Sequence, residues 1–345
     1  MVYNKKKVLV GMSGGVDSSV AALLLKRAGF EVVGAHMKCW DYDEPECSGS
    51  EDEKAARLAA SHIGIPFYVF DFQKEYKRKV FDYFLKEYKA GRTPNPDVMC
   101  NKFIKFGLFF EKALELGFDY IATGHYARIN KGRLLKGKDK DKDQSYFLAF
   151  IKPSVLKRVI FPLGKYTKKE VRKMAERAKL PTALRPDSQG LCFVGEVKME
   201  SFLKRYIKQK PGLIADAAGK TIGRHNGLWF YTIGQRKGIG LAGGPYFVLE
   251  KDLENNVLVV TKNEQDLLKK ELTAKNINWL AGNFQKSSDR VKVMIRYRQK
   301  PTLATLSLRS ATKVVFDKPQ RAITPGQSVV FYKNQQLLGG GVITG

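Results

Sequence analysis

Apolar positions in the N-terminal half of the chain alternate between strand and helix patterns. Residues 7–10 form a short β-branched run, a Ser/Gly turn follows, and apolar residues then recur at helical spacing over 20–25 until Gly29. The same alternation predicts further strands at 31–36, 66–70 and 120–123, and amphipathic helices at 50–63, 81–88 and 101–116. Strands that alternate with helices predict an α/β fold with a doubly wound parallel sheet, whose ligands bind at the carboxyl ends of the strands.

The pattern becomes β-rich in the second half of the chain. Residues 130–143 are lysine-rich with alternating charge and predict an exposed hairpin or loop, and 167–179 predict a helix capped by Thr167. Beyond about residue 200, glycines separate short alternating apolar segments, which predicts a small β-rich middle domain. A C-terminal β-barrel is predicted from five strand-like runs at 291–297, 302–308, 313–316, 328–332 and 336–342. We therefore expect three domains, at 1–199, 200–272 and 273–345.

Composition fits a basic globular protein of two or three domains. The 345 residues include 61 Lys and Arg against 34 Asp and Glu, a formal net charge of +27. This excess favours a polyanionic partner, because neutralised phosphates release counterions, although a generally basic proteome or a solubility adaptation would give the same excess. No stretch resembles a membrane span and the N-terminal apolar run is too short for a signal peptide, so we expect a cytoplasmic protein without membrane contact.

The four cysteines, at positions 39, 47, 100 and 192, form no C-x-x-C pair. In a reducing compartment this argues against a structural disulfide framework. His36 and His62 lack the spacing that would join Cys39 and Cys47 in a zinc site. Any paired cysteines in this chain are therefore expected to be catalytic.

The turn at 11–19 has the features of a phosphate-binding loop. Glycines let the backbone approach an anion, the first N–H groups of the following helix point at it, and Ser13, Ser18 and Ser19 add hydroxyl donors. The loop lacks the lysine of a Walker loop. Its S-G-G-x-D-S pattern closely resembles the pyrophosphate loop of ATP pyrophosphatases, which adenylate a substrate oxygen. Asp17 is our candidate to hold the metal that neutralises the leaving group, and an ordinary βα turn is the alternative.

Two cysteines lie in segments that suit nucleophilic chemistry. Cys100 stands immediately before the predicted 101–116 helix, where the helix dipole favours thiolate, and Asp97 is close enough to exchange protons with a bound base. Cys192 follows in a predicted loop. A thiolate or persulfide would displace an oxygen that adenylation has activated. Taken singly, each cysteine is more often a buried small hydrophobe, so the prediction rests on the whole constellation.

Six motifs occur in the order found in one family. They are S-G-G-V-D-S-S, N-P-D-V-M-C-N, T-G-H-Y-A-R, K-D-Q-S-Y-F-L, D-S-Q-G-L-C-F-V-G and Y-T-I-G-Q-R-K-G-I-G. In these motifs the chain resembles, over nearly its full length, the tRNA-specific 2-thiouridylases of bacteria (the MnmA family) and their mitochondrial counterparts. Gln189 and Leu191 stand where that family often has Thr and Ile, and neither departure affects Cys192.

The resemblance implies an ATP-dependent tRNA-uridine 2-sulfurtransferase with an adenine nucleotide hydrolase-like fold, which converts the wobble uridine of certain tRNAs into 2-thiouridine with ATP and Mg²⁺. ATP contacts are implied for Gly11, Met12, Ser13, Gly14, Gly15, Val16, Asp17, Ser18, Met37 and Gly124. The target base would be flipped out of the stack, because C2 of a stacked uracil is poorly accessible, and it would then contact Asn95, Pro96 and Asp97.

Contacts with the rest of the tRNA are implied for His125, Lys142, Asp143, Gln144, Arg296, Tyr297 and Gln327. Each has a plainer alternative. His125 at a strand end is equally a satisfied core or turn histidine, and the lysines at 136–142 are in part a solvated face. Arg296 and Arg298 alternate on a predicted strand, so they share a face, which suits phosphate contact or plain exposure to solvent.

The resemblance also implies a sequence of steps. Uracil O2 attacks the α-phosphorus of ATP and releases pyrophosphate, and Cys192 then delivers sulfur to C2 from a persulfide supplied by a sulfur-relay donor. Cys100 either attacks Cys192 to free the sulfide or resolves it afterwards, which leaves a Cys100–Cys192 disulfide, and the sequence does not order these events. Asp97 is the candidate general acid or base. We expect the protein to be a monomer.

Two other classes of function stay open at this point. Another enzyme with this loop would be an amidotransferase-type synthetase, which needs a glutaminase and gives two loop cysteines no role. A 4-thiouridine synthetase would carry an RNA-binding domain ahead of the loop, where about ten residues stand here. The non-enzyme alternative is a basic tRNA-binding chaperone with a relic nucleotide loop, which predicts no pyrophosphate release with tRNA and ATP.

Overall fold

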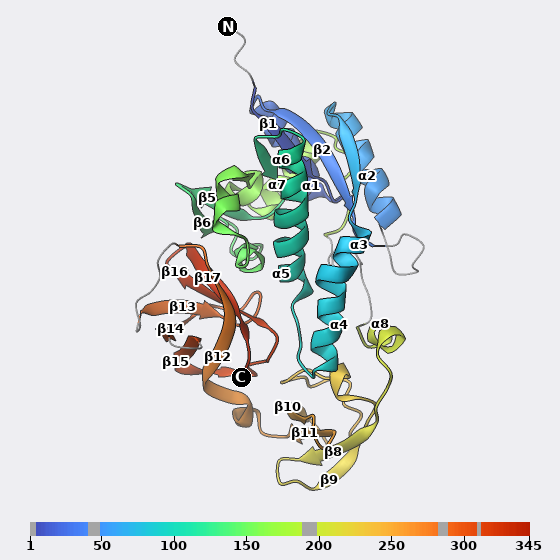
Figure 1. Cartoon of the computed structure of the whole chain (residues 1–345), viewed down its shortest axis with the longest axis vertical. Coiled ribbons are helices and arrows are strands. Elements are labelled where there is room, and N and C mark those ends of the chain that lie inside the picture. Colours follow the sequence, from blue (N-terminus) through green and yellow to red (C-terminus); the bar gives the residue numbers. More distant parts are fainter. Residues whose placement is uncertain (1–4, 41–48, 188–198, 282–288, 309–311) are drawn as a thin grey trace.

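The computed structural model describes residues 5–40, 49–187, 199–281, 289–308 and 312–345. Figure 1 shows an N-terminal α/β domain (blue to green) above a small middle domain (yellow to light orange) and a C-terminal barrel (orange to red). None of the helices in these residues is long and apolar enough to cross a membrane.

The N-terminal domain is built on a five-stranded sheet in the order β3-β2-β1-β4-β7, in which every neighbouring pair is parallel. Its strands are β1 (Lys7–Gly11), β2 (Glu31–Lys38), β3 (Phe67–Asp71), β4 (Tyr120–Ala122) and β7 (Val159–Ile160). The order of strands reverses between β2 and β4, so the carboxyl end of β1 lies at the switch point where open α/β sheets bind ligands. The predicted doubly wound sheet is confirmed.

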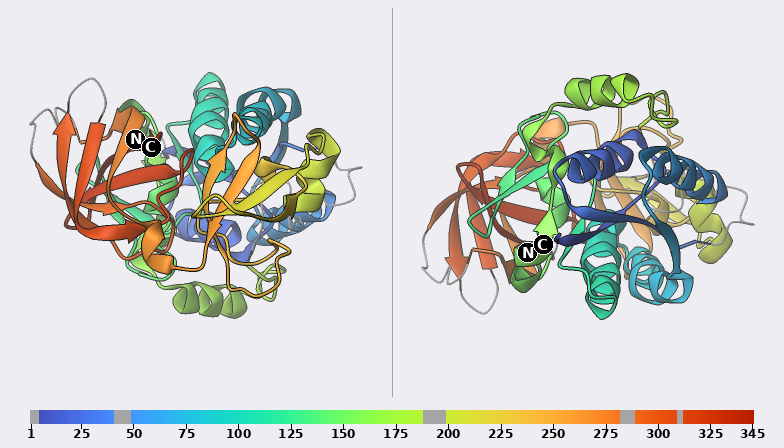
Figure 2. Two further views of the ribbon diagram at one scale, coloured as in Figure 1. Left: turned by 90° about the horizontal axis from the view of Figure 1, so that it is seen from below. Right: turned by 90° about the horizontal axis from the view of Figure 1, so that it is seen from above.

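Helices cover both faces of this sheet, as Figure 2 shows. Successive residues of β1 point to opposite faces, so Val8 and Val10 join one core cluster and Leu9 joins another. The first cluster includes α1 (Val16–Arg27), α2 (Gly49–Ile63) and α7 (Lys168–Arg177). The second includes α3 (Gln73–Tyr76), α4 (Asp82–Lys89), α5 (Pro96–Cys100) and α6 (Phe109–Glu115), with π-helical segments η1 (Lys77–Phe81) and η2 (Asn101–Leu108).

The C-terminal domain is a closed antiparallel barrel of six strands rather than the five predicted. Its strands are β12 (Leu268–Trp279), β13 (Arg290–Met294), β14 (Thr302–Leu308), β15 (Thr312–Arg321), β16 (Ser328–Lys333) and β17 (Gln336–Ile343). β12 closes the barrel by pairing with both β15 and β17. A hairpin of the N-terminal domain, β5 (Ala127–Asn130) and β6 (Arg133–Lys136), continues this sheet beyond β17.

The middle domain is β-rich, as the glycine spacing predicts. Its sheet has the order β10-β11-β8-β9. The strands are β8 (Gly212–Asp216), β9 (Thr221–His225), β10 (Phe247–Asp252) and β11 (Val257–Thr261), and α8 (Met199–Tyr206) precedes them. Short 3₁₀ turns complete the chain: η3 (Ser145–Leu148), η4 (Pro153–Arg158), η5 (Pro162–Lys165), η6 (Leu228–Phe230) and η7 (Glu264–Leu267). The predicted domain boundary at 272/273 falls inside β12.

Candidate active site

Hydrogen bonds within the loop between β1 and α1 fix its conformation. Gly15 is the N-cap of α1, and Gly14 adopts a left-handed conformation with φ +80° that favours glycine. The Ser13 N–H donates to Ser18 Oγ at 3.2 Å, and the Ser18 hydroxyl donates to Gly15 O at 3.1 Å. The side chain of Met12 is fully buried, so only its backbone is available to a ligand. This arrangement leaves the first N–H groups of α1 free of intrahelical partners, as an anion site requires.

Three neighbouring segments approach the loop so closely that a Cβ at the glycine of each contact would be crowded. A Cβ on Gly124, just after β4, would lie 2.8 Å from Ser18 N. A Cβ on Gly14 would lie 2.3 Å from Asp52 O, at the start of α2. A Cβ on Gly11 would lie 3.1 Å from Met37 Cε, at the end of β2. The predicted convergence of the ends of β1, β2 and β4 on one crevice is therefore present, with Met37 and Gly124 beside the loop.

Asp17, in the first turn of α1, is engaged by two groups from elsewhere in the domain. The Lys168 ammonium donates to its two carboxylate oxygens at 2.7 and 2.8 Å, and the Tyr126 hydroxyl donates to Oδ1 at 2.7 Å. Lys168 is the first residue of α7, and the capping box of Thr167 and Glu170 fixes that helix start. Burial first, and then the Asp17 charge, raises the pKa of Tyr126, which keeps the phenol protonated. Sequence reasoning missed Lys168, because nothing in 167–179 marks it as facing the loop.

Asp187 extends this ion network toward the D-S-Q-G-L-C segment. It accepts from Lys168 at 2.9 Å and from Arg172 at 2.6 Å, and it pairs with Lys142. Burial opposes ionisation of Asp187, but hydrogen bonds from Lys142 and Lys168 hold its pKa well below the ordinary value. Asp187 is therefore an anion at neutral pH.

Arg185, two residues before Asp187, contacts the phosphate loop directly. It donates to Gly14 O at 3.0 Å and pairs with Asp52 at 2.8 Å. Lys142, which the resemblance assigns to tRNA contact, is here a member of this internal network. Cys192, together with Cys47, lies outside the residues that the structure describes, so the site is described up to Asp187 on this side.

The helix that carries Asp97 and Cys100 begins earlier than predicted. Asn95 is its N-cap, accepts from the Val98 N–H at 3.2 Å, and is followed by Pro96 at the first helical position. α5 then continues through η2 into α6, so Cys100 lies more than one turn inside the helical run and not at its start. The dipole effect falls off within the first turn, so the predicted stabilisation of a Cys100 thiolate by the helix end is wrong.

Cys100 is fully buried, and it belongs to the core cluster on the α5 face of the sheet. Asp97 is partly exposed. The Asn101 amide donates to the Asp97 carbonyl at 3.0 Å, one turn further along the same helix. Among the described residues, no group of three or more His, Cys, Asp or Glu gathers as a metal-binding cluster.

The residues predicted to contact tRNA from the N-terminal domain all have partners within the protein, although only His125 among them is buried. His125 is 8% exposed, lies 2.7 Å from Thr123 Oγ1 and packs against Phe106 and Phe161. Burial lowers the pKa of His125 well below its ordinary value, so the ring is neutral. Asp143 accepts from the backbone of Gly137 and Ser145, and Gln144 accepts from the Tyr126 N–H, which makes both of them braces of the 126–145 segment.

The three predicted tRNA residues of the barrel also have internal partners. Arg296 and Tyr297 follow the end of β13 in a turn, so the prediction that Arg296 and Arg298 share a strand face is wrong. The Arg296 guanidinium donates to Ala322 O at 2.6 Å, just after the end of β15. The ring of Tyr297 lies 4.4 Å from that of Phe147, between centroids. Gln327 donates to backbone carbonyls at the start of the α5 segment.

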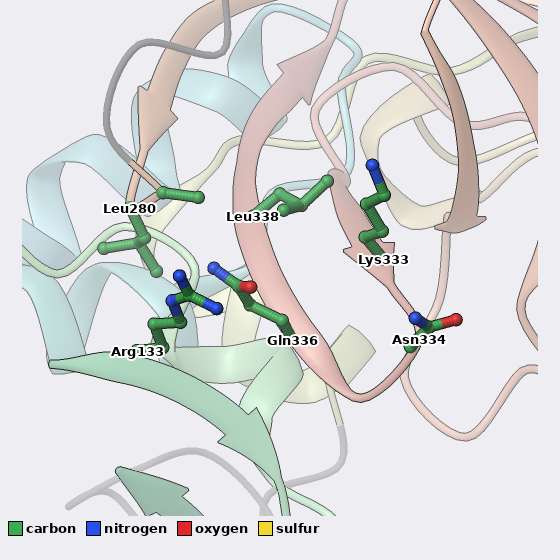
Figure 3. Close-up of a pocket in the computed structure, with 7 residues that line it drawn as sticks. Arg133, Leu280, Lys333, Asn334, Gln336 and Leu338 are labelled. Carbon is green, nitrogen blue, oxygen red and sulfur yellow. The ribbon is translucent and has the colours of Figure 1, made fainter. Parts of the chain in front are cut away.

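A separate cavity of about 670 Å³ lies where the β5–β6 hairpin meets the barrel. Figure 3 shows Arg133 from β6 and Gln336 from β17 reaching toward one another across it. It is lined by Arg133, Leu280, Ala281, Lys333, Asn334, Gln336 and Leu338. None of these is a predicted site residue, so this cavity is distinct from the phosphate-loop crevice.

Comparison with known proteins covers nearly the whole chain. A family model described as "tRNA methyl transferase HUP domain" matches residues 6–196. Models described as "tRNA methyl transferase PRC-barrel domain" and "Aminomethyltransferase beta-barrel domain" match 200–262 and 269–343. These three matches follow the parallel sheet, the middle domain and the barrel in order.

Curated relatives are identical to this chain at nearly half of the aligned positions. The chain is 48% identical over 353 residues to the tRNA-specific 2-thiouridylase MnmA 1 of Geobacillus kaustophilus, which covers 98% of this chain and 95% of that one. It is 47% identical over 350 residues to the tRNA-specific 2-thiouridylase MnmA of Bacillus subtilis, with 98% and 94% covered. Among solved structures, the U34-tRNA thiolase NcsA of Methanococcus maripaludis aligns with a TM-score of 0.40 and 22% identity, over 59% of this chain and 66% of that one.

Proposed function

Since this chain belongs to the family of tRNA-specific 2-thiouridylases, we propose that it is an ATP-dependent tRNA sulfurtransferase that makes 2-thiouridine at the wobble position. It adenylates O2 of the uridine, releases pyrophosphate and replaces the activated oxygen with sulfur. The observation that carries this proposal is the 48% identity over 98% of the chain, found together with a phosphate loop at the switch point of the sheet.

The residues of the crevice fit ATP. Gly14 and Gly124 let the start of α2 and the end of β4 pack directly against the loop backbone, because a Cβ at either position would overlap Asp52 O or Ser18 N. The loop offers backbone N–H groups and serine hydroxyls, and Lys168 and Arg185 supply positive charge within reach of it. For Mg²⁺ we propose Asp17 as the protein ligand, because carboxylate oxygen is the donor that this hard cation prefers. Both oxygens of Asp17 accept from Lys168 in this structure, so metal binding would require the ammonium to move from Asp17 to the phosphates.

Lys168 takes the place of the lysine that a Walker loop would contain. Its ammonium reaches the first turn of α1 from the start of α7, with its side chain only 12% exposed. In a site shielded from water, this charge stabilises the negative charge that develops on the departing pyrophosphate. ATP itself supplies the activation of the uracil oxygen, and the chain supplies position and charge.

Asp97 and the two cysteines complete the proposed reaction. Asp97, in the first turn of α5 and partly exposed, takes the proton that leaves the uracil when O2 attacks phosphorus. Cys192 delivers the outer sulfur of its persulfide to C2, and AMP leaves with the former O2. Cys100 displaces that sulfur from Cys192, which leaves a Cys100–Cys192 disulfide for an external reductant. Since Cys100 is fully buried here, base binding must expose it by a local movement of α5.

Partners follow from the same chemistry. tRNA is the substrate, a persulfide-carrying protein is the sulfur donor, and we propose that the enzyme works as a monomer in the cytoplasm. The description of the matched family model names a methyl transferase, whose product would be a methylated nucleoside. The experiment below distinguishes a methylated from a thiolated product.

The test is nucleoside analysis of tRNA incubated with the protein, MgATP and a sulfide source. We expect 2-thiouridine, and pyrophosphate released only when tRNA is present. A methylated nucleoside in place of the thiolated one would overturn the proposal. tRNA binding without any pyrophosphate release would instead favour the chaperone alternative.

A further inference from the structure

The segment of residues 91–95, which connects α4 to α5, lies where all three domains meet. In Figure 1 this connection runs between the middle domain below it and the barrel beside it. From the middle domain, Lys251 donates to Gly91 O at 2.9 Å and the hydroxyl of Thr232 lies 3.3 Å from that of Thr93. Leu253 packs so closely that a Cβ on Gly91 would lie 2.5 Å from its Cδ2.

The barrel holds the same segment from the other side. Gln327 donates its amide to Thr93 O at 2.9 Å and to Pro94 O at 3.2 Å. The Thr93 N–H donates to Pro325 O at 2.9 Å. A Cβ on Gly326 would lie 2.9 Å from both the nitrogen and the carbonyl oxygen of Thr93, so the two backbones are in contact. Both polar backbone groups of Thr93 are thus satisfied by the barrel.

These contacts pass directly into the helix that carries the reacting groups. Asn95, the N-cap of α5, hydrogen-bonds the Tyr146 hydroxyl through its side chain. The same hydroxyl donates to Ser328 O at 2.8 Å, next to Gln327 in the barrel. The start of α5, and with it the position of Asp97, is therefore set by the two β domains as much as by the parallel sheet.

We propose that Gln327 and Lys251 are positioning residues that clamp the 91–95 segment and so hold α5 in the geometry needed for adenylation of the target uridine. This inference rests on the proposed function. It differs from the tRNA contact that the sequence resemblance implies for Gln327, because both carbonyls that its amide nitrogen reaches belong to the protein. Burial lowers the pKa of Lys251 to about 8, which agrees with an ammonium withdrawn from solvent by its docking on Gly91.

The sharpest test is Gln327→Glu. A carboxylate in this position faces two carbonyl oxygens without a proton to donate, so its charged form is disfavoured and its pKa is raised. At about pH 8 we expect tRNA-dependent pyrophosphate release at saturating tRNA to fall roughly tenfold or more, with the dissociation constant for tRNA within about twofold of wild type. At about pH 6 the protonated Glu donates again, so activity relative to wild type at the same pH should recover.

The matched control is Gln335→Glu, which makes the same change at an exposed position of the same barrel and should leave the rate and its pH profile unchanged. Lys251→Met is the second test and Lys262→Met, exposed in the same domain, is its control. We expect Lys251→Met to lower the rate at saturating tRNA and Lys262→Met to leave it unchanged. Thermal unfolding of each variant shows whether a lower rate comes from loss of the fold or from a displaced 91–95 segment in a folded protein.

Two outcomes would overturn the clamp. One is a weaker tRNA affinity of Gln327→Glu with an unchanged rate at saturating tRNA, which would make Gln327 a tRNA contact. The other is a loss of rate in Gln327→Glu that does not recover at lower pH while the protein stays folded. Failure of the proposed function is distinguishable from both, because wild-type protein would then make no 2-thiouridine.

Discussion

At the scale of single residues, the sequence predicts groups that are close along the chain and misses those brought together by folding. The loop from Gly11 to Ser18 is readable because strand, turn and helix are contiguous. Lys168, by contrast, reaches Asp17 across 151 positions of sequence, and Arg185 reaches Gly14 across 171. No local pattern encodes such a contact, and a charged residue in the first turn of a helix is ordinarily exposed.

The first residue-scale prediction concerns Lys168→Met. We expect tRNA-dependent pyrophosphate release to fall by about a hundredfold, because the variant loses a preorganised positive charge beside the leaving group. The neighbouring Lys169 is exposed, and Lys169→Met should retain wild-type release. The measurement is the initial rate of pyrophosphate release by both variants. Near-normal release by Lys168→Met would remove this lysine from the chemistry.

The second residue-scale prediction concerns the thiols. Cys100→Ser and Cys192→Ser should each abolish formation of 2-thiouridine and leave tRNA affinity near that of wild type, because a hydroxyl does not carry or accept sulfur. Cys39→Ser is the control, since Cys39 is also buried but lies outside the proposed relay. Mass spectrometry of the nucleosides gives the readout. Thiolated product from either relay variant would contradict the two-cysteine mechanism.

At the scale of elements, the strongly periodic segments are predicted best. β14 matches its predicted range, and β2, β16 and β17 each extend one or two residues beyond theirs. β12 was missed because most of its first residues are exposed and Asn276 within it has a positive φ of 54°, so no clean apolar alternation marks it. The early start of α5 did have a signal, an Asn followed by a Pro, but the apolar pattern downstream drew the predicted boundary to 101.

An element-scale prediction follows from the start of α7. Thr167 accepts from the Glu170 N–H and Glu170 accepts from the Thr167 N–H, which fixes the turn that carries Lys168. Thr167→Ala should lower the free energy of unfolding by about 1 kcal/mol and also reduce pyrophosphate release, because the cap and the aim of Lys168 are lost together. Thr167→Ser keeps the hydroxyl and is the control. Chemical denaturation and the release assay are measured on the same preparations, and full activity of Thr167→Ala would show that the cap does not position Lys168.

At the scale of the whole molecule, the domains are joined more tightly than a linear division of the sequence implies. The β5–β6 hairpin of the first domain extends the barrel sheet, and the 91–95 segment is held by both other domains. The three-part order of the chain is visible in its composition. The contacts between the parts are not, because they pair backbone groups such as Thr93 N–H and Pro325 O, which carry no signature of residue type.

The last prediction concerns the net charge, which is a property of the whole molecule and not of a single site. The formal charge of +27 is what remains after all 34 Asp and Glu are counted against the 61 Lys and Arg, so ion pairs such as those of Asp17, Asp187 and Asp52 do not reduce it. If the surplus contacts tRNA phosphates, binding releases counterions, and the logarithm of the association constant falls linearly with the logarithm of salt concentration. Between about 50 and 200 mM salt, six to ten such contacts weaken binding by roughly 10³ to 10⁵. Binding titrations across this range, with the thermal midpoint followed as a control for the fold, measure the slope, and a flat response would show that the excess charge serves solubility alone.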